Sequence, residues 1–212
     1  MEPRDGILKA AQVVFARHGF RQTAMAMVAE EAGLSRQALY HHFASKEALF
    51  AGLVDALHEA ALDAATTAAL KSAPSAPEAI AGVMLAYHKA LVSRVAGSPF
   101  VAELIEESGR LCGAAVSSFG KRFEKELEGV VAAFVRDGRF KLRGGVTPRD
   151  VMEMVQVAAK GVKAAHAGES EARYAQALKR MIDVIFAGVE APGGVSSVKR
   201  TKAMGTARRI AR

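Results

Sequence analysis

The sequence predicts an all-α fold, with about three short N-terminal helices joined by a long helix to a helical C-terminal domain. Half of the 212 residues are hydrophobic, which is ample for a core. Alanine, leucine, glutamate and lysine dominate over runs of β-branched residues, as helices favour. Apolar residues also recur at the three- and four-residue spacing of a helix face. The length fits one domain or two small ones.

The first predicted helix covers residues 5–18. Four apolar residues fall on one face of it, namely Ile7, Ala11, Val14 and Phe15. Gly19 is expected to end this helix, because glycine adopts the left-handed conformation at little cost. Phe20 can then fold back onto Phe15.

Two short helices follow. Thr23 is expected to cap a helix over residues 24–32 through its hydroxyl, and Gly33 makes the next turn. Ser35 is expected to cap the second helix, over residues 36–43. The buried stripe of the helix over 24–32 consists of Met25, Val28, Ala29 and Ala32.

The rest of the chain also reads as helical. Ser45 caps a long helix over 46–71, roughly 40 Å at about 1.5 Å per residue, which is enough to connect two domains. Further helices are predicted over 78–96, 100–108, 114–135, 148–166 and 171–187. Thr147, Pro148 and Asp150 form a strong helix start. A loop is expected near Gly109, and Gly188 is expected to stop the last helix.

The charge is concentrated in the tail. The net charge is +7, but six of the 29 basic residues follow residue 190 without any acid, which leaves 23 basic against 22 acidic residues elsewhere. Residues 191–212 are rich in glycine, serine and cations without apolar periodicity, so they are predicted to be a disordered basic tail. This tail is either a flexible arm that contacts phosphates or a solubilising extension, and the high pI is not itself evidence that the folded part binds nucleic acid.

The sequence does not support a secreted protein, a membrane protein or an enzyme. No signal peptide, membrane-spanning run or disulfide pair is visible, because the N-terminus is charged, the apolar runs are short and Cys112 is the only cysteine. A cytoplasmic protein without a membrane partner is therefore expected. No metal-binding spacing, phosphate-binding glycine loop or nucleophile elbow is present, so no enzyme, cofactor or metal is predicted. His41 and His42 are adjacent, and their side chains diverge by about 100°.

The helix over residues 36–43 has two distinct faces. Leu39 and Phe43 point toward a core, whereas Arg36, Gln37, Tyr40 and His41 point the other way. Arginine and glutamine can pair with the edges of guanine and adenine, and the other two side chains can donate to phosphates. A plain solvated face is the alternative. The preceding helix and glycine turn favour a helix-turn-helix motif at about 24–43 instead.

Residues 7–50 resemble the DNA-binding domain of the TetR family of bacterial transcriptional regulators. The matching segments, in order, include FARHGF at 15–20, VAEEAGLS at 28–35, LYHHF at 39–43 and SKEAL at 45–49. The resemblance implies a DNA-binding domain over 1–50 and a C-terminal ligand-binding and dimerisation domain over 51–190. It also implies a homodimer bound to a palindromic operator in double-stranded DNA.

The resemblance assigns DNA contacts to eight residues: Thr23, Ser35, Arg36, Gln37, Tyr40, His41, His42 and Lys46. Arg36 and Gln37 would read bases, while Tyr40, His41 and Lys46 would anchor phosphates. The chain departs from the family at Ala26 and Met27, where a polar or acidic residue is usual. This departure removes the reciprocal half of a capping box and a possible contact to DNA.

The last two predicted helices would pair with their symmetry mates. Their apolar stripes, which could equally face the monomer's own core, contain Val151, Val155, Ala158, Val162, Leu178, Met181, Ile182 and Ile185. The middle of the chain offers side chains for a largely apolar ligand pocket or for a helical core, namely Met84, Tyr87, His88, Cys112, Phe119 and Phe123. Tyr87 and His88 are the candidates to orient a ligand, and Cys112 is expected to be a small buried hydrophobe.

The sequence therefore predicts a ligand-responsive repressor that leaves a palindromic operator when a small molecule binds. Two alternatives stay open. One is a DNA-binding protein controlled by a protein partner or by abundance, without a small-molecule inducer. The other is a helical enzyme or ligand carrier, which no motif supports.

Overall fold

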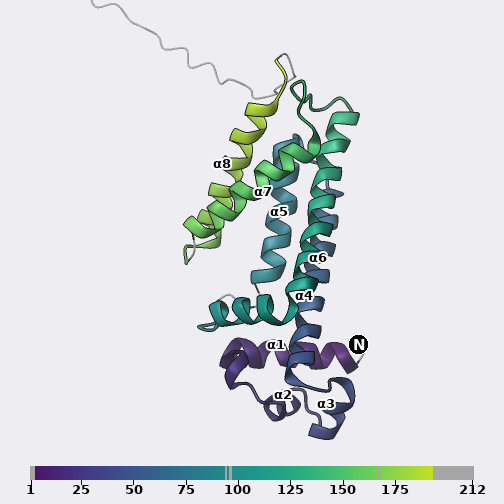
Figure 1. Ribbon diagram of the computed structural model, residues 1–212, viewed down its shortest axis with the longest axis vertical. Helices are drawn as coiled ribbons and strands as arrows, with labels where there is room; N and C mark the ends of the chain where they lie inside the picture. The colour runs from purple at the N-terminus through teal and green to yellow at the C-terminus, as the bar shows by residue number, and fades with distance from the viewer. Residues whose placement is uncertain (1–2, 94, 96, 167, 193–212) are drawn as a thin grey trace, which may run out of the picture.

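The computed structural model describes residues 3–93, 95, 97–166 and 168–192. Over these residues the chain forms eight helices (Figure 1), as the all-α prediction requires. They are α1 (Pro3–Gln22), α2 (Met25–Glu31), α3 (Arg36–His42), α4 (Lys46–Ala69), α5 (Ala76–Val92), α6 (Val101–Arg136), α7 (Pro148–Ala165) and α8 (Glu171–Val189). Within the described ranges, no helix combines the length and apolar character needed to cross a bilayer.

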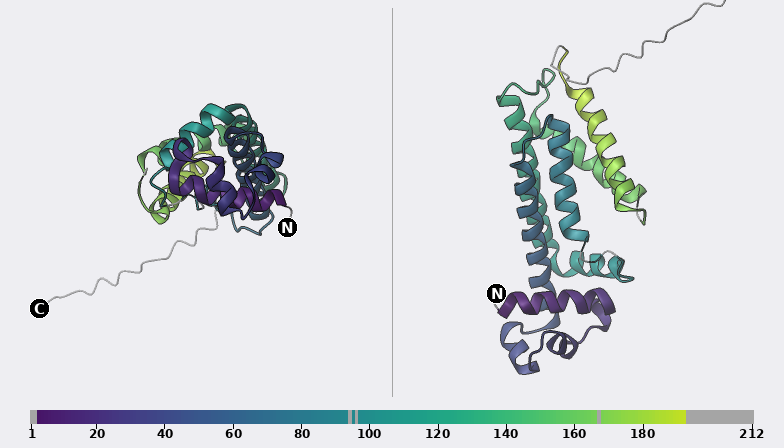
Figure 2. Two further views of the ribbon diagram at one scale, coloured as in Figure 1. Left: turned by 90° about the horizontal axis from the view of Figure 1, so that it is seen from below. Right: turned by 180° about the vertical axis from the view of Figure 1, so that it is seen from behind.

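The helices are arranged along one long axis. Helices α1, α2 and α3 gather at one end, where α1 lies across the axis (Figures 1 and 2). Helix α4 leaves this end and runs along the axis beside α5 and α6, and α7 and α8 pack against each other. The two ends have separate hydrophobic clusters. An N-terminal cluster contains Leu39, Phe43 and Phe50, and a C-terminal cluster contains Ile80, Leu127 and Phe186.

Helix α1 bends at Gly19, where the backbone has φ 74° and ψ 172°. The glycine interrupts the helix there, as expected, and a short second helical segment follows to Gln22. The fold-back of Phe20 is confirmed, since its ring stacks on that of Phe15 with the centroids 5.9 Å apart. Phe50 of α4 closes an aromatic trio, 5.1 Å from Phe15 and 5.0 Å from Phe20.

Helix α6 is one helix of 36 residues, so the loop expected near Gly109 is wrong. A helical glycine costs only about 1 kcal/mol relative to alanine, which packing on both sides of it can offset. The first turns of α6 lie across the long axis next to α1, and the remainder runs along it (Figure 1). Leu104 and Cys112 accordingly belong to the N-terminal cluster, and Leu127 and Val131 to the C-terminal one.

The start of α7 follows the predicted capping box. The Thr147 hydroxyl oxygen accepts from the Asp150 amide at 3.2 Å, and the Thr147 amide donates to the Asp150 carboxylate at 2.8 Å. Helix α8 passes through Gly188 and ends at Val189, so Gly188 does not stop it. The Ala191 amide then donates to the Lys141 carbonyl at 2.8 Å, which extends the folded part past residue 190. The rest of the predicted tail, from residue 193, lies outside the described residues.

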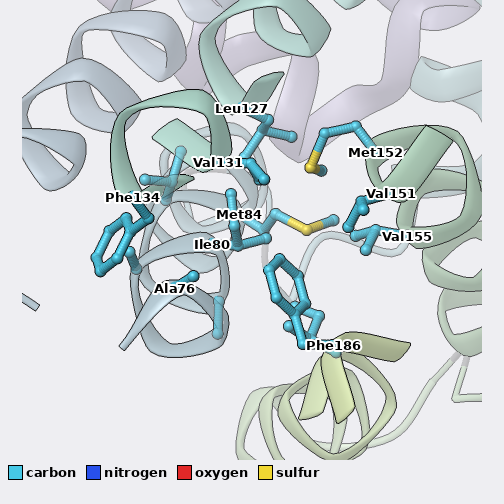
Figure 3. Close-up of a cluster of buried hydrophobic side chains, with 14 of the residues drawn as sticks. Ala76, Ile80, Met84, Leu127, Val131, Phe134, Val151, Met152, Val155 and Phe186 are labelled. Atoms are coloured by element: carbon cyan, nitrogen blue, oxygen red, sulfur yellow. The ribbon is translucent and has the colours of Figure 1, made fainter. Parts of the chain in front are cut away.

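The C-terminal cluster contains residues predicted to serve the dimer or a ligand. In Figure 3, Val151, Val155 and Met84 lie among its buried side chains. Val151, Val155, Leu178 and Ile182 are all 0% exposed, so they have no surface to offer a second copy. The apolar stripes of α7 and α8 therefore face the protein's own core.

Candidate nucleic-acid interface

Helix α3 is held from one side and open on the other. The Ser35 hydroxyl accepts from the Ala38 amide at 3.1 Å, which confirms the predicted cap. Leu39 is fully buried, and Phe43, just beyond the helix, packs in the same N-terminal cluster. The residues predicted to read DNA point away from this core and are exposed: Ser35, Arg36, Gln37, Tyr40, His41 and His42.

Helix α2 begins differently from the prediction. Its N-terminal cap is Ala24, which has no side-chain acceptor, and the Ala24 amide instead lies 3.4 Å from the Met27 sulfur. The Thr23 hydroxyl donates to the Gly19 carbonyl at 2.6 Å and the residue is 3% exposed. Thr23 therefore joins α2 to the bend in α1, and the prediction that it caps α2 is wrong. Its predicted contact to DNA stays a prediction.

Lys46 lies at the start of α4, close to the end of α1. Its ammonium donates to the Phe20 carbonyl at 2.9 Å and to the Arg21 carbonyl at 3.3 Å. It also lies 4.6 Å from the centroid of the Phe20 ring. An ammonium has three donors, so these contacts leave one for a phosphate. The predicted phosphate contact stays a prediction.

The start of α6 is joined to the end of α1 by charged groups. The Arg21 amide donates to the Glu103 carboxylate at 2.7 Å, and the Arg21 guanidinium lies 3.3 Å from both Glu106 and Glu107. Glu107 is 4% exposed and also accepts from Arg110 at 2.7 Å. These hydrogen bonds, led by Arg110, hold the pKa of Glu107 below its usual range. The joint therefore keeps a buried carboxylate charged between two guanidinium groups.

A cavity of about 380 Å³ lies where the two ends of the molecule meet. It is walled by α1, α4, α5, the first half of α6 and one residue of α7, and we call it the seam cavity. Phe15, Phe50 and Leu104 are among its mostly apolar lining residues. Its volume falls within the range of about 300–1,000 Å³ usual for small-molecule sites.

Comparison with known proteins shows which family the N-terminal region resembles. Residues 7–53 match the model described as bacterial regulatory proteins, tetR family. The chain is 43% identical over 58 residues to the HTH-type transcriptional regulator TtgR of Pseudomonas putida, which covers 27% of this chain and 28% of that protein. It is 39% identical over 51 residues to UidR of Escherichia coli, covering 24% and 26%. Residues 7–53 of this chain therefore resemble the DNA-binding region of the TetR family.

This chain matches only about a quarter of the length of these curated relatives. Solved structures match the whole fold. A putative TetR-family regulator from Mesorhizobium loti superposes with a TM-score of 0.64 at 18% identity, over 89% of this chain and 97% of that one. SmeT of Stenotrophomonas maltophilia, described as the repressor of a multidrug efflux pump, superposes with a TM-score of 0.60 at 21% identity, covering 90% and 91%. The family model and these relatives are described as transcriptional regulators, not as enzymes.

The structure brings together three of the six residues predicted to bind a ligand, Tyr87, Phe119 and Phe123, beside His58. Of the six, only His88 lines the seam cavity. Met84 and Cys112 are buried in different clusters. Phe119 stacks on His58 at 5.0 Å, and Phe123 stacks on Tyr87 at 4.0 Å. In the part of the chain that the structure describes, no three His, Cys, Asp or Glu side chains form a set that could hold a metal.

The sequence did not identify two ionisable residues that line the seam cavity, His58 and Lys163. The His58 Nδ1 lies 3.0 Å from the Tyr87 hydroxyl oxygen. Burial lowers the pKa of His58 and of His88 and raises that of Tyr87. A histidine within an otherwise apolar helix face, as at His58, was the available signal, but it says nothing about which other helices meet it.

Proposed function

We propose that the protein is a homodimeric, sequence-specific DNA-binding transcriptional regulator that acts in the cytoplasm as a repressor released by a small molecule. The observation that carries the proposal is α3, whose polar face is exposed while Leu39 and Phe43 anchor it from behind. Such a helix, with the preceding turn at Gly33, fits a major groove. The match of residues 7–53 to the TetR-family model supports the same interpretation.

The side chains of α3 divide into two chemical roles. Arg36 can donate to the O6 and N7 atoms of guanine, and Gln37 can pair with adenine. Tyr40 is 45% exposed despite its aromatic ring, which suits a hydroxyl that donates to a phosphate. His41 is exposed beside it and can do the same.

A palindromic operator requires two recognition helices related by a two-fold axis, one turn or about 34 Å apart. Helices α7 and α8 offer an apolar surface for this pairing. Met154 and Val157 on α7 and Val184 on α8 are 42%, 71% and 68% exposed. The predicted residues Ala158, Val162, Met181 and Ile185 are partly buried and lie on the same two helices. We therefore move the proposed interface from the buried stripes to this surface.

The seam cavity suits a ligand that alters DNA binding. We keep the proposed division into residues 1–50 and 51–190, and the cavity has walls from both parts. A ligand shifts the equilibrium between two conformations only by its difference in affinity for them. A compound that fits the cavity better when the recognition helices are misplaced would release the operator.

Fluorescence anisotropy with DNA from upstream of the gene tests the function. Wild-type protein should bind tightly at about 150 mM salt with excess competitor DNA, and the Arg36→Ala, Tyr40→Ala double variant should lose this binding. Arg143→Ala removes one exposed cation at the far end of the molecule and should bind as wild type does. Weak, sequence-indifferent binding by all three proteins would contradict the proposal for this DNA.

Two further experiments test the role of the basic tail and the response to a ligand. Deletion of residues 193–212 should flatten the salt dependence of DNA binding if the tail contacts phosphates. An unchanged slope would mean that the tail does not contact DNA. A thermal-shift screen tests the ligand response, because a compound that binds the folded protein raises its Tm. A compound with equal affinity for free and DNA-bound protein is not an inducer. A screen without a hit, with operator binding intact, would favour control by a partner or by abundance.

A further inference from the structure

The seam cavity is built largely from the core of the DNA-binding end. Phe15, Phe50, Leu53, Val54 and Leu104 line it and are all buried members of the N-terminal cluster. That cluster also contains Leu39 and Phe43, which hold the recognition helix. Within the described residues, no member of the C-terminal cluster lines the cavity. An occupant would therefore pack against the core behind α3.

The polar part of the lining has one sign of charge. Among the described residues that line the cavity, Lys163 of α7 is the one charged side chain, and no carboxylate is present. His58 and His88 add two imidazoles. Burial, followed by the nearby Lys163 ammonium, lowers the pKa of His88, so its ring is neutral at pH 7 and has one N–H to donate.

Two acidic side chains outside the lining affect the pKa values of its histidines. Asp55 raises the pKa of His58, and Glu171 raises that of His88, but in each case burial has the larger and opposite effect. Both acids are exposed to solvent, which screens their charge. Two other grooves along α6 are lined by charges of both signs, so neither offers an apolar molecule the mostly apolar lining of the seam cavity.

We propose that the seam cavity binds a small apolar carboxylic acid, whose carboxylate pairs with Lys163 and accepts a hydrogen bond from His88. The apolar body lies against Phe15, Phe50 and Leu104. This assignment names the ligand class of the proposed regulator and rests on that proposed function. It also places the ligand against the DNA-binding core itself.

A short chain of contacts leads from the cavity to the DNA-binding surface. The rings of Phe15 and Phe50 contact that of Phe20, and Lys46 holds the Phe20 carbonyl at 2.9 Å. An occupant that displaces Phe15 or Phe50 shifts the end of α1 and the start of α4 together. The ligand and the operator thus favour different arrangements of the same N-terminal hydrophobic cluster.

Three probes of equal chain length test the ligand class: octanoate, 1-octanol and octylamine. Isothermal titration calorimetry with the full-length protein at pH 7 should show octanoate binding at least about tenfold more tightly than octanol, because a charge-assisted hydrogen bond is added. Octylamine should bind most weakly. Equal binding of octanoate and octanol, or tighter binding of octylamine, would overturn the proposal, as would no binding of any probe.

Lys163→Met keeps the length of the side chain and removes its charge. It should reduce the preference for octanoate over octanol to within about twofold and leave octanol binding unchanged. Lys160→Met, on the same helix but outside the lining, is the matched control and should keep the full preference. An equal loss in both variants would mean a general charge effect and would contradict the assigned role of Lys163.

Operator binding without any probe separates this proposal from the function on which it rests. Wild type and Lys163→Met should bind DNA equally, because Lys163 lies on α7, away from α3. Intact operator binding with no preference for octanoate would overturn only the ligand class. Loss of operator binding in the wild type would instead contradict the proposed regulator.

Discussion

At the scale of residues, Gly19 shows why one position accepts only glycine. With φ 74° and ψ 172°, its backbone lies in a region almost confined to glycine. A Cβ there would come within 2.8 Å of a Glu103 carboxylate oxygen and 2.9 Å of the Phe100 ring. The bend of α1 and its joint with α6 therefore depend on the same missing side chain.

Gly19→Ala should lower the free energy of unfolding by about 1–3 kcal/mol, the cost of that backbone region. Urea denaturation followed by circular dichroism measures it. Gly82→Ala in α5, where a Cβ meets nothing within 4 Å, is the control and should be neutral or slightly stabilising. Equal stability of Gly19→Ala and wild type would show that α1 can straighten without cost.

His58 and His88 should make stability depend on pH below neutrality. Burial lowers both pKa values from the ordinary 6.5, so above 6.5 the rings are neutral in the folded and unfolded states alike. As the pH falls below 6.5, the unfolded chain takes up protons that the folded chain resists, and stability is lost. Nearby charges change the pKa values less than burial does. Asp55 acts on His58, and Lys163 and Glu171 act on His88.

Thermal melts from pH 7.5 to pH 5.5 should therefore show a falling Tm for the wild type. The fall should be smaller in His58→Asn and in His88→Asn, whatever their Tm at pH 7.5. The same slope in all three proteins would contradict the assignment.

At the scale of elements, the caps of α2 and α3 differ although the helices are equally short. Ser35 gives α3 a side-chain acceptor, whereas Ala24 gives α2 none. A serine or threonine cap contributes about 0.5–2 kcal/mol. The helix-turn-helix motif thus has one strong start and one weak start.

Ala24→Ser should raise the free energy of unfolding by about 0.5–1 kcal/mol, and Ser35→Ala should lower it by about 1 kcal/mol. The backbone at Ala24 is already extended, with φ −106° and ψ 148°, so the new serine needs no rearrangement. For a chain of this size, 1 kcal/mol corresponds to about 2–4 °C in Tm, which scanning calorimetry resolves. Opposite signs for the two substitutions are the expected result, and a lower Tm for Ala24→Ser would contradict it.

At the scale of the whole molecule, the exposed apolar residues of α7 and α8 should decide the oligomeric state. Val157→Lys together with Val184→Lys places two cations on the proposed interface, where their burial is costly. Sedimentation velocity at micromolar concentration should show a dimer for the wild type and a monomer for this variant. Leu70→Lys replaces a residue that is 83% exposed outside these helices and should stay dimeric. A monomeric wild type would contradict the proposed dimer.

The all-α fold, the start of most helices and the exposed face of α3 could be predicted from the sequence, because each depends on near neighbours. Ser35, Ser45 and Thr147 cap helices through amides three residues away. Leu39 and Phe43 share a face because of the helical period alone. The family resemblance over residues 7–50 rests on the same local pattern.

Only the tertiary structure decided where those helices meet. Thr23 bonds to the bend in α1 rather than capping α2, and α6 continues through Gly109 because both of its halves are packed. The seam cavity joins His88 with Lys163 and with walls from three other helices. Helical periodicity fixes which residues share a face but leaves open which partner covers it, since burial stabilises any apolar partner. The buried stripes of α7 and α8 could therefore be identified in advance, but not the exposed surface that is left for a second copy.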